Sequence, residues 1–297
     1  MQNWDDLRLF LAVAREESLS GAGKILRLDP ATLGRRVARL EKALGVALFL
    51  KSPQGYALTE AGVGLLERAE TAEQAMRQAS SVVSAPTDQL RGQIRIGAPD
   101  GAANFLLPQV CAAMGQAHPD LDIQIVALPR VFNLSRREAD MAIAVSPPTG
   151  SRLVVQKVTE YHLHLAAATT YLAAHGQVTH VDSLKDHRIV GYIPDMIFDR
   201  ELDYLADLGI ERVPLASNSV SVQLQMIAQG GGLGVVHDFI LPFVPGVQRV
   251  LMNVVHLKRA FYLIRHADDR GNLRLSDFAA QLSAALKAEV ARLEAMA

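Results

Sequence analysis

The sequence predicts a chain of two parts. The first is an N-terminal all-α winged helix-turn-helix that continues into a long linker helix, and the second is a C-terminal α/β domain of two subdomains. The length of 297 residues corresponds to about two domains, at about 150 residues per domain. Residues 4–58 show three helical spacings followed by a hairpin pattern. From residue 93 onward, short β-type runs alternate with helical segments, which is typical of α/β folds.

The charge is unevenly distributed along the chain. The whole sequence has a net charge of −1 and 49% hydrophobic residues, enough for a packed core. The segment 20–58 alone carries seven Lys and Arg against two acidic residues, so the rest of the chain is acidic. A small basic module on an acidic domain is typical of nucleic-acid-binding proteins, and a solvated helix face is the alternative interpretation.

Cysteine usage and the N-terminal residues indicate the compartment. The single cysteine, Cys111, can form neither an internal disulfide nor a cysteine-based metal site, which fits a reducing environment. Cys111 lies in an apolar helical pattern, so we expect a buried small residue rather than a nucleophile. Trp4, Asp5 and Asp6 stand where a signal peptide needs a basic start, and no run of 18 apolar residues occurs. We therefore expect a cytoplasmic protein without a membrane partner.

The first three helices have recognisable ends. Apolar residues at i, i+3, i+4 and i+7 predict a helix over residues 4–14. Ser18 is the expected N-cap of a second, short helix. Asp29 and Pro30 are the expected N-cap and first position of a third helix, which ends near Gly45.

The third helix has one apolar and one cationic face. Its apolar face comprises Leu33, Val37, Leu40 and Leu44, and the opposite face carries Thr32 and three arginines. A short helix, a tight turn and a second helix with exposed arginines is the arrangement that places a recognition helix in the major groove. Residues 48–51 and 56–58 predict a hairpin, the wing. The expected DNA-facing residues are Ser18, Thr32, Arg35, Arg36, Arg39 and Lys51. For each of them, a phosphate contact is the alternative to base readout.

A heptad-like pattern follows the hairpin. Thr59 can cap a helix whose apolar residues are spaced 4, 3, 4, 3 and 4, namely Leu65, Ala69, Ala72, Met76, Ala79 and Val83. This seam predicts dimerisation, and a helix lying on its own domain is the alternative. We expect a winged helix-turn-helix domain at 1–58, a linker helix and hinge at 59–90, and an α/β domain at 91–297.

The α/β domain is predicted from its alternating pattern. Strand patterns occur at 93–97, 121–128, 140–145, 188–192, 212–216 and 233–236, and helical patterns at 106–114 and 219–229. This order predicts mostly parallel sheets with ligand crevices at the carboxyl ends of the strands.

The N-terminal motifs resemble a known family. Phe10–Ala14, Ser18–Ala22, Leu40-Glu41, Leu44-Gly45, Leu48-Phe49 and Leu58–Gly62 resemble the signature of LysR-type transcriptional regulators. The family usually has Gln where Pro30 stands and Ser where Gly34 stands, so no glutamine base contact is carried over. The resemblance implies double-stranded promoter DNA as partner, an antiparallel dimerisation helix, assembly to a dimer or tetramer, and RNA polymerase as a candidate partner.

Looser motifs extend the resemblance to the second domain. Ile94–Gly97, Leu107-Pro108, His118-Pro119, Glu138–Ile143 and Gly230–Val236 resemble the family's effector-binding domain, which is similar in fold to periplasmic binding proteins. The resemblance implies subdomain I at about 91–161 and 265–297, subdomain II at about 162–264, and a small-molecule effector between them.

The strand ends supply the expected pocket walls. The expected effector-binding residues are Pro99, Asp100, Gly101, Ala102, Arg130, Ser146, Tyr192, Ser217, Asn218 and His237. In the family, the loop that contains Asp100 commonly offers Ser or Thr and helix-start amides to an acidic effector. A carboxylate there would repel an anion, so we expect a neutral or cationic effector, or an acid held by Arg130. Alternatively, Asp100 caps its own helix and faces away from the pocket.

Other functions find less support in the residues. Gly230–Gly234 follows a helical pattern and precedes a strand, the reverse of a dinucleotide-binding loop, so we expect a turn. His162 and His164 share a strand face without further metal ligands. We therefore expect no enzyme, no cofactor and no metal. The alternative function is a ligand-independent DNA-binding protein whose α/β domain serves only oligomerisation. This alternative would be favoured if no small molecule changed the melting temperature of the isolated residues 91–297.

Overall fold

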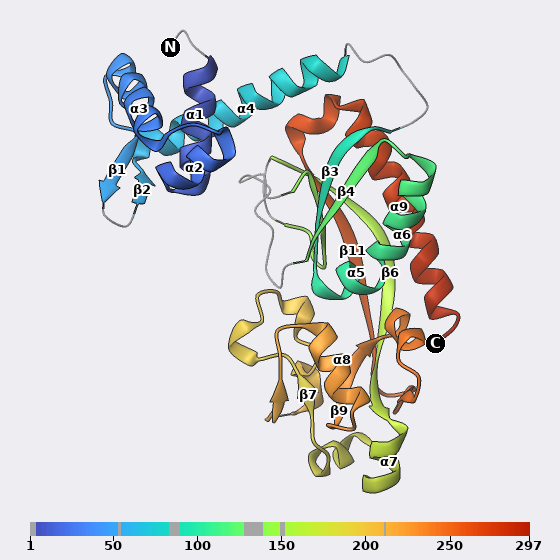
Figure 1. Cartoon of the computed structure of the whole chain (residues 1–297). Coiled ribbons are helices and arrows are strands. Elements are labelled where there is room, and N and C mark those ends of the chain that lie inside the picture. The colour runs from blue at the N-terminus through green and yellow to red at the C-terminus, as the bar shows by residue number, and fades with distance from the viewer. Residues whose placement is uncertain (1–3, 53–54, 83–89, 128–138, 149–151, 211) are drawn as a thin grey trace. The chain divides into compact units, whose positions relative to one another are not determined.

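The computed structural model describes residues 4–52, 55–82, 90–127, 139–148, 152–210 and 212–297 (Figure 1). Its contacts divide the chain into two compact units, Met1–Thr87 and Asp88–Ala297.

The N-terminal unit begins with three helices, and the sequence specifies their ends. They are α1 (Trp4–Glu16), α2 (Leu19–Leu26) and α3 (Pro30–Leu44). The Ser18 side chain accepts a hydrogen bond from the Gly21 amide and caps α2. Asp29 caps α3 by accepting from the Thr32 amide, and Gly45 ends it in the left-handed conformation at φ 73°. The predicted caps of both helices are confirmed.

A two-stranded hairpin follows α3. Strands β1 (Phe49–Ser52) and β2 (Gly55–Leu58) pair antiparallel. The Glu41 carboxylate on α3 accepts hydrogen bonds from the amides of Leu48 and Phe49 at 2.8 and 3.2 Å, which fixes the hairpin to the end of α3. The buried core of this unit contains Leu7, Leu9, Phe10, Leu11, Val13, Ala22, Leu33, Val37, Leu40, Leu48, Phe49 and Ala69. The predicted winged helix-turn-helix is present.

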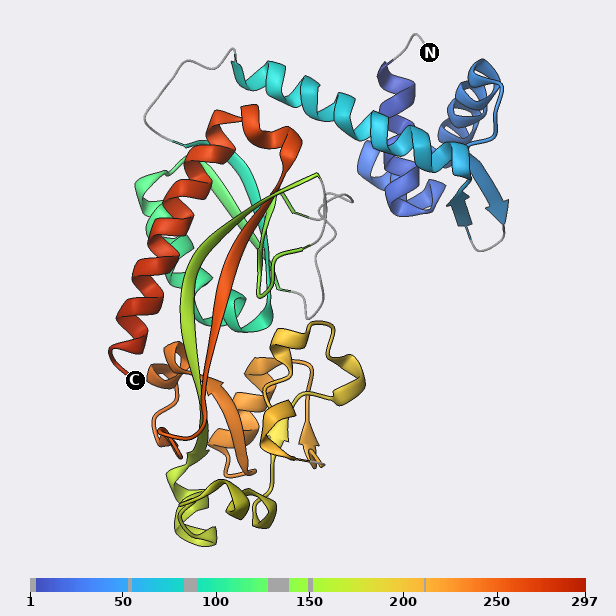
Figure 2. The ribbon, with the colours of Figure 1, turned by 180° about the vertical axis from the view of Figure 1, so that it is seen from behind.

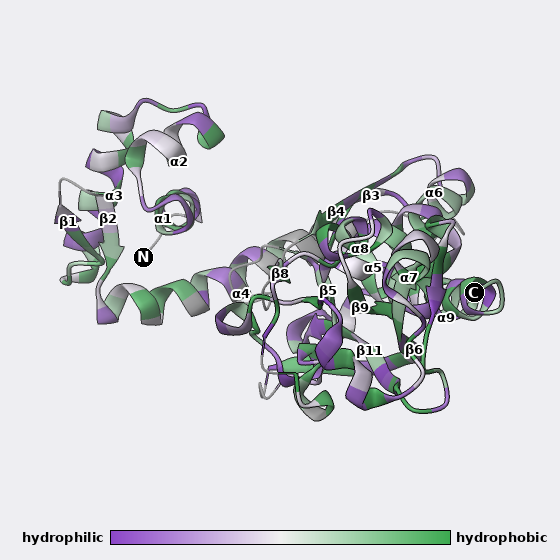
Figure 3. Cartoon of the chain, turned by 90° about the horizontal axis from the view of Figure 1, so that it is seen from below, coloured by the Kyte–Doolittle hydropathy of each residue, from purple (hydrophilic) through white to green (hydrophobic). Residues whose placement is uncertain are grey.

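The long helix α4 (Glu60–Val82) begins on this core. Hydrophobic and hydrophilic residues alternate along it (Figure 3). Ala69 is only 1% exposed and packs into the core of its own unit, and Leu65 and Ala72 pack against the same core. The expectation that all six seam residues face a second chain is therefore wrong for Ala69. Met76 is exposed, whereas the Ala79 side chain and Val83 lie outside the described part of the chain.

The second unit contains a large mixed sheet and one small sheet. The strands of the large sheet are β3 (Gly92–Ala98), β4 (Leu121–Ala127), β5 (Met141–Ala144), β6 (Leu153–Ala168), β9 (Leu233–His237), β10 (Val247–Arg249) and β11 (His256–His266). They follow the order β10-β6-β11-β5-β3-β4, and β9 also pairs with β6. The small sheet consists of β7 (Val190–Gly191) and β8 (Leu215–Ala216).

Two long antiparallel strands connect the ends of this unit. β6 has 16 residues and β11 has 11, and they pair with each other antiparallel. The expectation of mostly parallel sheets is therefore wrong for these strands, because β6 and β11 run back and forth between two lobes. We call the half with β3, β4, β5 and α5 the first lobe, and the half with β7, β8, β9 and α8 the second lobe; β6 and β11 run through both (Figure 1).

Helices cover the sheet. The α-helices are α5 (Asp100–Phe105), α6 (Leu107–Ala117), α7 (Thr169–His175), α8 (Val220–Ala228) and α9 (Leu273–Glu294). Helix α9 contacts β6 and α6 (Figure 2). Short 3-10 helices are η2 (Val181–Asp186), η3 (Pro194–Met196), η4 (Arg200–Leu202), η5 (Ala206–Leu208), η6 (Asp238–Phe243) and η7 (Ala267–Gly271). Of these, η3, η4 and η5 lie between β7 and β8.

The glycine-rich segment forms the predicted turn between α8 and β9. Gly230 has φ 74° and Gly232 has φ 153°, in the region that favours glycine. A Cβ on Gly232 would meet the Arg188 carbonyl oxygen. These glycines therefore allow a close backbone approach within the second lobe.

Candidate functional sites

The exposed face of α3 carries one arginine without an acidic partner in the part of the chain that the structure describes. Arg35 is exposed, and its guanidinium donates a hydrogen bond to the Thr32 hydroxyl at 3.2 Å. Both residues lie in the first two turns of α3, directly after the Asp29 cap. A flexible cation and a hydroxyl group at the start of an exposed helix can bond base edges or phosphates.

The other two arginines of α3 are bonded to α1. Asp6, which is 9% exposed, accepts hydrogen bonds from Arg36 at 2.6 and 2.9 Å and from Arg39 at 2.8 Å. Burial raises the pKa of Asp6, but its hydrogen bonds and charge interactions with Arg39 and Arg36 outweigh that effect, and the pKa lies below its ordinary value. Sequence spacing missed this contact because Asp6 is 30 residues away from Arg36.

The hairpin carries Lys51, the last of the positively charged residues that were expected to face DNA. The Lys51 ammonium lies 3.3 Å from the Glu41 carboxylate, and its side chain is 49% exposed. Ser18 caps α2, so its hydroxyl oxygen is occupied by the Gly21 amide. The structure thus groups Thr32 and Arg35 on one face, bonds Arg36 and Arg39 to Asp6, and places Lys51 on the wing.

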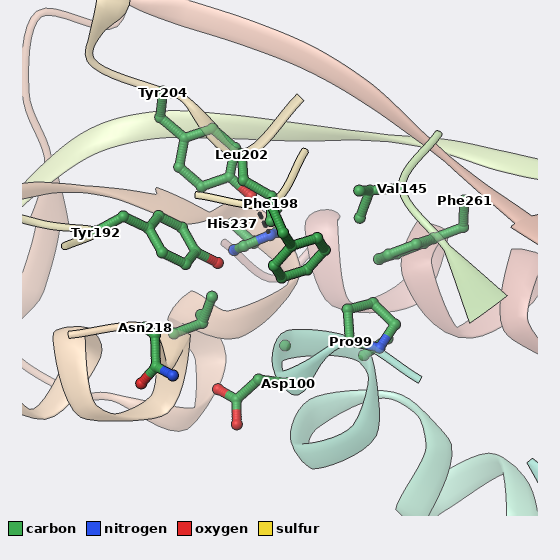
Figure 4. A pocket seen from close by; sticks show the side chains of 13 residues that line it. Pro99, Asp100, Val145, Tyr192, Phe198, Leu202, Tyr204, Asn218, His237 and Phe261 are labelled. Atoms are coloured by element: carbon green, nitrogen blue, oxygen red, sulfur yellow. Dashed lines mark hydrogen bonds between the residues drawn. The ribbon is translucent and has the colours of Figure 1, made fainter. Parts of the chain in front are cut away.

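A small pocket lies between the two lobes of the second unit. It is lined by Pro99, Asp100, Gly101, Ala102, Val145, Tyr192, Phe198, Leu202, Tyr204, Asn218, Val220, His237 and Phe261 (Figure 4). Its free interior is about 20 Å³, which is room for a single water molecule. The first lobe contributes the start of α5, and the second lobe contributes α8 and the ends of β7 and β9.

Most of the expected pocket residues line this space. Pro99, Asp100, Gly101, Ala102, Tyr192, Asn218 and His237 do so. Ser146 and Ser217 are not among the lining residues: Ser146 donates a hydrogen bond to Asp199, and the Ser217 hydroxyl accepts from the Ser219 amide at 3.1 Å. Arg130 lies outside the described residues.

Six lining residues were not expected from the sequence. Val145 and Val220 adjoin predicted positions, whereas Phe198, Leu202 and Tyr204 lie in or beside 3-10 helices that have no periodic signal. Phe261 lies on β11, a strand that the sequence analysis did not predict, although apolar residues cluster at its centre. Phe198 and Tyr204 lie between the predicted strands 188–192 and 212–216. Their aromatic character was the signal that could have identified them as pocket residues.

Asp100 bonds the first lobe to the second. One oxygen of its carboxylate accepts hydrogen bonds from the Ser219 hydroxyl at 3.0 Å, the Ser221 amide at 2.8 Å and the Ser221 hydroxyl at 3.0 Å. The other oxygen accepts from the Asn104 amide group at 3.1 Å. Asp100 lines the pocket, and its carboxylate lies against the N-terminus of α8. The alternative interpretation, that Asp100 caps its own helix and faces away from the pocket, is therefore wrong.

His237 is a buried, neutral member of the pocket. Its side chain is 4% exposed, and burial lowers its pKa to about 3. Nε2 lies 3.4 Å from the Tyr204 hydroxyl, and Nδ1 has no hydrogen-bond partner among the described residues. Tyr161 stacks on the imidazole with ring centroids 5.4 Å apart, and its buried hydroxyl is likewise without a partner there.

A second cavity adjoins the interlobe pocket. It has a volume of about 320 Å³ and lies within the second lobe, lined mainly by apolar residues of η3, η5 and their neighbours. Tyr192, Leu202 and Tyr204 line both cavities, so these three side chains form the wall between them.

Other candidate chemical groups have structural partners. His162 Nδ1 lies 2.9 Å from the Glu294 carboxylate, and His164 Nδ1 lies 2.8 Å from that of Asp238. Burial raises the pKa of the Cys111 thiol to about 11, so the reactive thiolate is scarce at neutral pH. Within the described ranges, no group of three or more His, Cys, Asp or Glu side chains could hold a metal ion.

Among the residues that the structure describes, no helix combines the length and the apolar character needed to span a membrane.

Comparisons with known proteins agree with this architecture. Residues 4–63 match the family described as bacterial regulatory helix-turn-helix protein, lysR family, and residues 87–287 match the LysR substrate binding domain. The regulator CrgA of Neisseria meningitidis serogroup C is 24% identical over 289 residues, covering 93% of this chain and 94% of CrgA. The regulator DmlR of Escherichia coli is 26% identical over 61% of this chain and 59% of its own length.

A solved structure is similar over nearly the whole chain. A variant of full-length OxyR from Pseudomonas aeruginosa has a TM-score of 0.75 and 17% identity, covering 97% of this chain and 95% of that one. The two matching domains together span most of the sequence, in the order that the two structural units show. The chain therefore belongs to the LysR family, as a DNA-binding transcriptional regulator with a helix-turn-helix domain and a substrate-binding domain for an effector.

Proposed function

We propose that the protein reads promoter DNA mainly through Thr32 and Arg35 at the start of α3. The observation that carries this proposal is the exposed Arg35 guanidinium, whose one hydrogen bond among the described residues is to the Thr32 hydroxyl, whereas Arg36 and Arg39 are bonded to Asp6. A recognition helix enters the major groove with its N-terminal residues at the base edges. The DNA phosphates are then contacted by Arg36, Arg39 and the wing residue Lys51. Ser18 acts chiefly as a helix cap.

The effector site is proposed between two subdomains, one of residues 91–161 and 265–297 and the other of residues 162–264. The interlobe pocket supports this proposal, because side chains from both lobes line it. A ligand that binds there favours one arrangement of the lobes over another. Its effect on the regulator can be no larger than the difference between its affinities for the two arrangements.

We propose self-association through the part of α4 beyond the core contact of Ala69. Met76 is exposed on this helix, and Ala79 and Val83 continue the spacing of its apolar residues. A two-fold dimer presents two recognition helices to a pseudo-palindromic site, and pairs of dimers form a tetramer. The proposed setting is the cytoplasm, with RNA polymerase as a further partner and no reaction catalysed.

The DNA proposal is tested with the full-length protein. Fluorescence anisotropy compares its binding to the DNA upstream of its own gene and to a scrambled duplex at two salt concentrations. We expect a preference of about a thousandfold for the upstream DNA. Weak, equal and steeply salt-dependent binding to both duplexes would show phosphate contact alone.

Arg35→Ala tests the residue assignment. We expect a loss of about 1–3 kcal/mol and relaxed preference at one base position. Arg8→Ala removes the same charge from an exposed position on α1 and serves as the matched control. Weakening by Arg35→Ala that is uniform across DNA sequences, without a matching loss in Arg8→Ala, would mark Arg35 as a phosphate contact.

A further inference from the structure

The interlobe pocket already contains a carboxylate supplied by the chain. Asp100 bonds the Ser221 amide in the first turn of α8 and the hydroxyls of Ser219 and Ser221, all within 3.0 Å. Helix α8 has nine residues, and its N-terminal amides and dipole favour a negative charge. The donors that would receive the acid group of a ligand are therefore taken by Asp100.

The described residues that line the pocket offer no positive charge. Among them Asp100 is the only charged residue, and His237 is neutral at physiological pH because burial lowers its pKa to about 3. Arg259, on β11 near the pocket, is paired with Glu201 at 2.7 Å. An anionic ligand would leave water and meet the Asp100 carboxylate, and none of the described residues that line the pocket is a cation that could compensate.

The pocket does offer aromatic faces and an unused hydrogen-bonding atom. Tyr192, Phe198, Tyr204 and Phe261 surround the space (Figure 4). The His237 ring lies among them, 4% exposed, with Nδ1 unpartnered among the described residues. Buried polar atoms are nearly always hydrogen-bonded, so this atom points to a partner that a ligand or water would supply.

We propose that Asp100 permanently occupies the acid-binding position of the pocket, and that the pocket therefore accepts a small, uncharged, ring-shaped ligand with one hydrogen-bonding group. This inference rests on the proposed function, in which the interlobe pocket is the effector site. The closed pocket holds about 20 Å³, and movement of Tyr192, Leu202 and Tyr204 would join it to the cavity of about 320 Å³ in the second lobe. The combined space is within the size range of small-molecule sites.

The first experiment removes the Asp100 carboxylate from the acid-binding position. The Tm of full-length Asp100→Ala is measured in sodium acetate and in sodium chloride at equal ionic strength. Acetate is expected to replace the lost carboxylate and to raise Tm saturably by about 2–4 °C, the shift that one restored interaction gives in a domain of about 200 residues. Wild-type protein is expected to show no difference between the two salts.

Two variants control this experiment. Asp195→Ala removes an exposed carboxylate from η3 and should respond like the wild type. Asp100→Asn keeps the side-chain volume, so it should block acetate and show no rescue. If acetate raises Tm equally in all four proteins, or in none of them, the proposal that Asp100 occupies the acid-binding position is wrong.

The second experiment uses the wild-type protein and does not depend on any variant folding. Tm is measured with benzyl alcohol and with benzoate at equal concentration and ionic strength. Benzyl alcohol is expected to raise Tm, and benzoate is not. An equal response to the two compounds, whether a shift or none, overturns the ligand class, as does a larger shift with benzoate.

Failure of this inference can be told from failure of the proposed function. The preference for upstream DNA is measured without ligand on the same full-length protein. Retained DNA preference without the acetate and alcohol effects would overturn only the ligand class. The acetate effect without any DNA preference would overturn only the DNA-reading proposal.

Discussion

The two units of this regulator each place one carboxylate at the site where a ligand is expected, but they satisfy it in different ways. In the N-terminal unit, Asp6 is bonded to the guanidinium groups of Arg36 and Arg39. In the α/β unit, Asp100 is bonded to neutral hydroxyl and amide donors at the start of α8. The first arrangement is a charge network, and the second is a hydrogen-bonded helix terminus.

This difference predicts different responses to ligands, salt and pH. The arginines that Asp6 holds are the groups that DNA phosphates attract, so Asp6 and DNA compete for them. The donors that Asp100 holds are uncharged, so salt screens their interaction less than it screens the network of Asp6. From the two proposals we therefore expect Asp6 to limit how strongly the first unit binds DNA, and Asp100 to limit which ligand the second unit accepts.

The largest expected effect is that of Asp6→Asn on the N-terminal unit. Removing the charge leaves two guanidinium groups beside a neutral amide, and hydrogen bonds to charged groups contribute about 1.5–3 kcal/mol. Because the Arg39 side chain is 59% exposed and stays hydrated, we expect a loss of about 1–2 kcal/mol in the free energy of unfolding. Chemical denaturation measures it, with Glu16→Gln as an exposed carboxylate control on α1.

The same variant tests the competition with DNA. At a temperature where Asp6→Asn is fully folded, the freed arginines should bind non-specific duplex more tightly, and the salt slope should steepen by about one per added phosphate contact. Weaker DNA binding would contradict the competition, because it would mean that Asp6 positions the arginines for DNA.

The pH dependence of stability provides a further test of the Asp6 network. The folded-state pKa of Asp6 lies below 3.8, its ordinary value, so the network stabilises the folded state above that pH. This contribution should decline as the pH falls from about 4 through the lowered folded pKa. The expected observation is a stability difference between wild type and Asp6→Asn that is constant near neutral pH and shrinks in acid. A difference that grows in acid would contradict the assignment.

The sequence predicts the N-terminal unit more completely than the α/β unit, because its signals are local. Ser18, Asp29 and Gly45 mark helix ends by their own chemistry, and the structure confirms all three. The contact between Asp6 and Arg36 is not local, and nothing in the spacing of either helix shows which side chains meet across them. The burial of Ala69 in the core of its own unit was missed for the same reason, since a heptad pattern does not say which surface covers it.

In the α/β unit, most short strands were recognised, whereas the short strand β10 and the long connecting strands were missed. β6 and β11 carry mixed polar and apolar residues because they pass through both lobes, so neither has a uniform alternation. The pocket residues at strand ends, such as Asp100 and His237, follow from topology. Phe198 and Tyr204 enter the pocket from short 3-10 turns, which leave no period in the sequence.

A smaller effect is expected for Asp100→Asn. The amide oxygen can still accept from the donors of α8, but the charge that favours the helix N-terminus is lost, which costs about 0.3–1 kcal/mol. We expect a decrease in stability of that size, and the decrease should persist in 0.5 M salt better than that of Asp6→Asn. An equal salt response of the two variants would contradict the difference between the charge network of Asp6 and the hydrogen-bonded helix terminus of Asp100.

The smallest expected effect on stability is that of Lys51→Ala on the wing. Lys51 is half exposed and its ion pair with Glu41 is a surface pair, so the free energy of unfolding should change by less than about 0.5 kcal/mol. Glu41 keeps its hydrogen bonds to the Leu48 and Phe49 amides, and the hairpin should therefore stay in place. DNA binding should nevertheless lose about one unit of salt slope, because one phosphate contact disappears. Lys42→Ala, at an exposed position in the last turn of α3, is the matched control. An equal loss of salt slope in both variants would show that the wing makes no phosphate contact of its own.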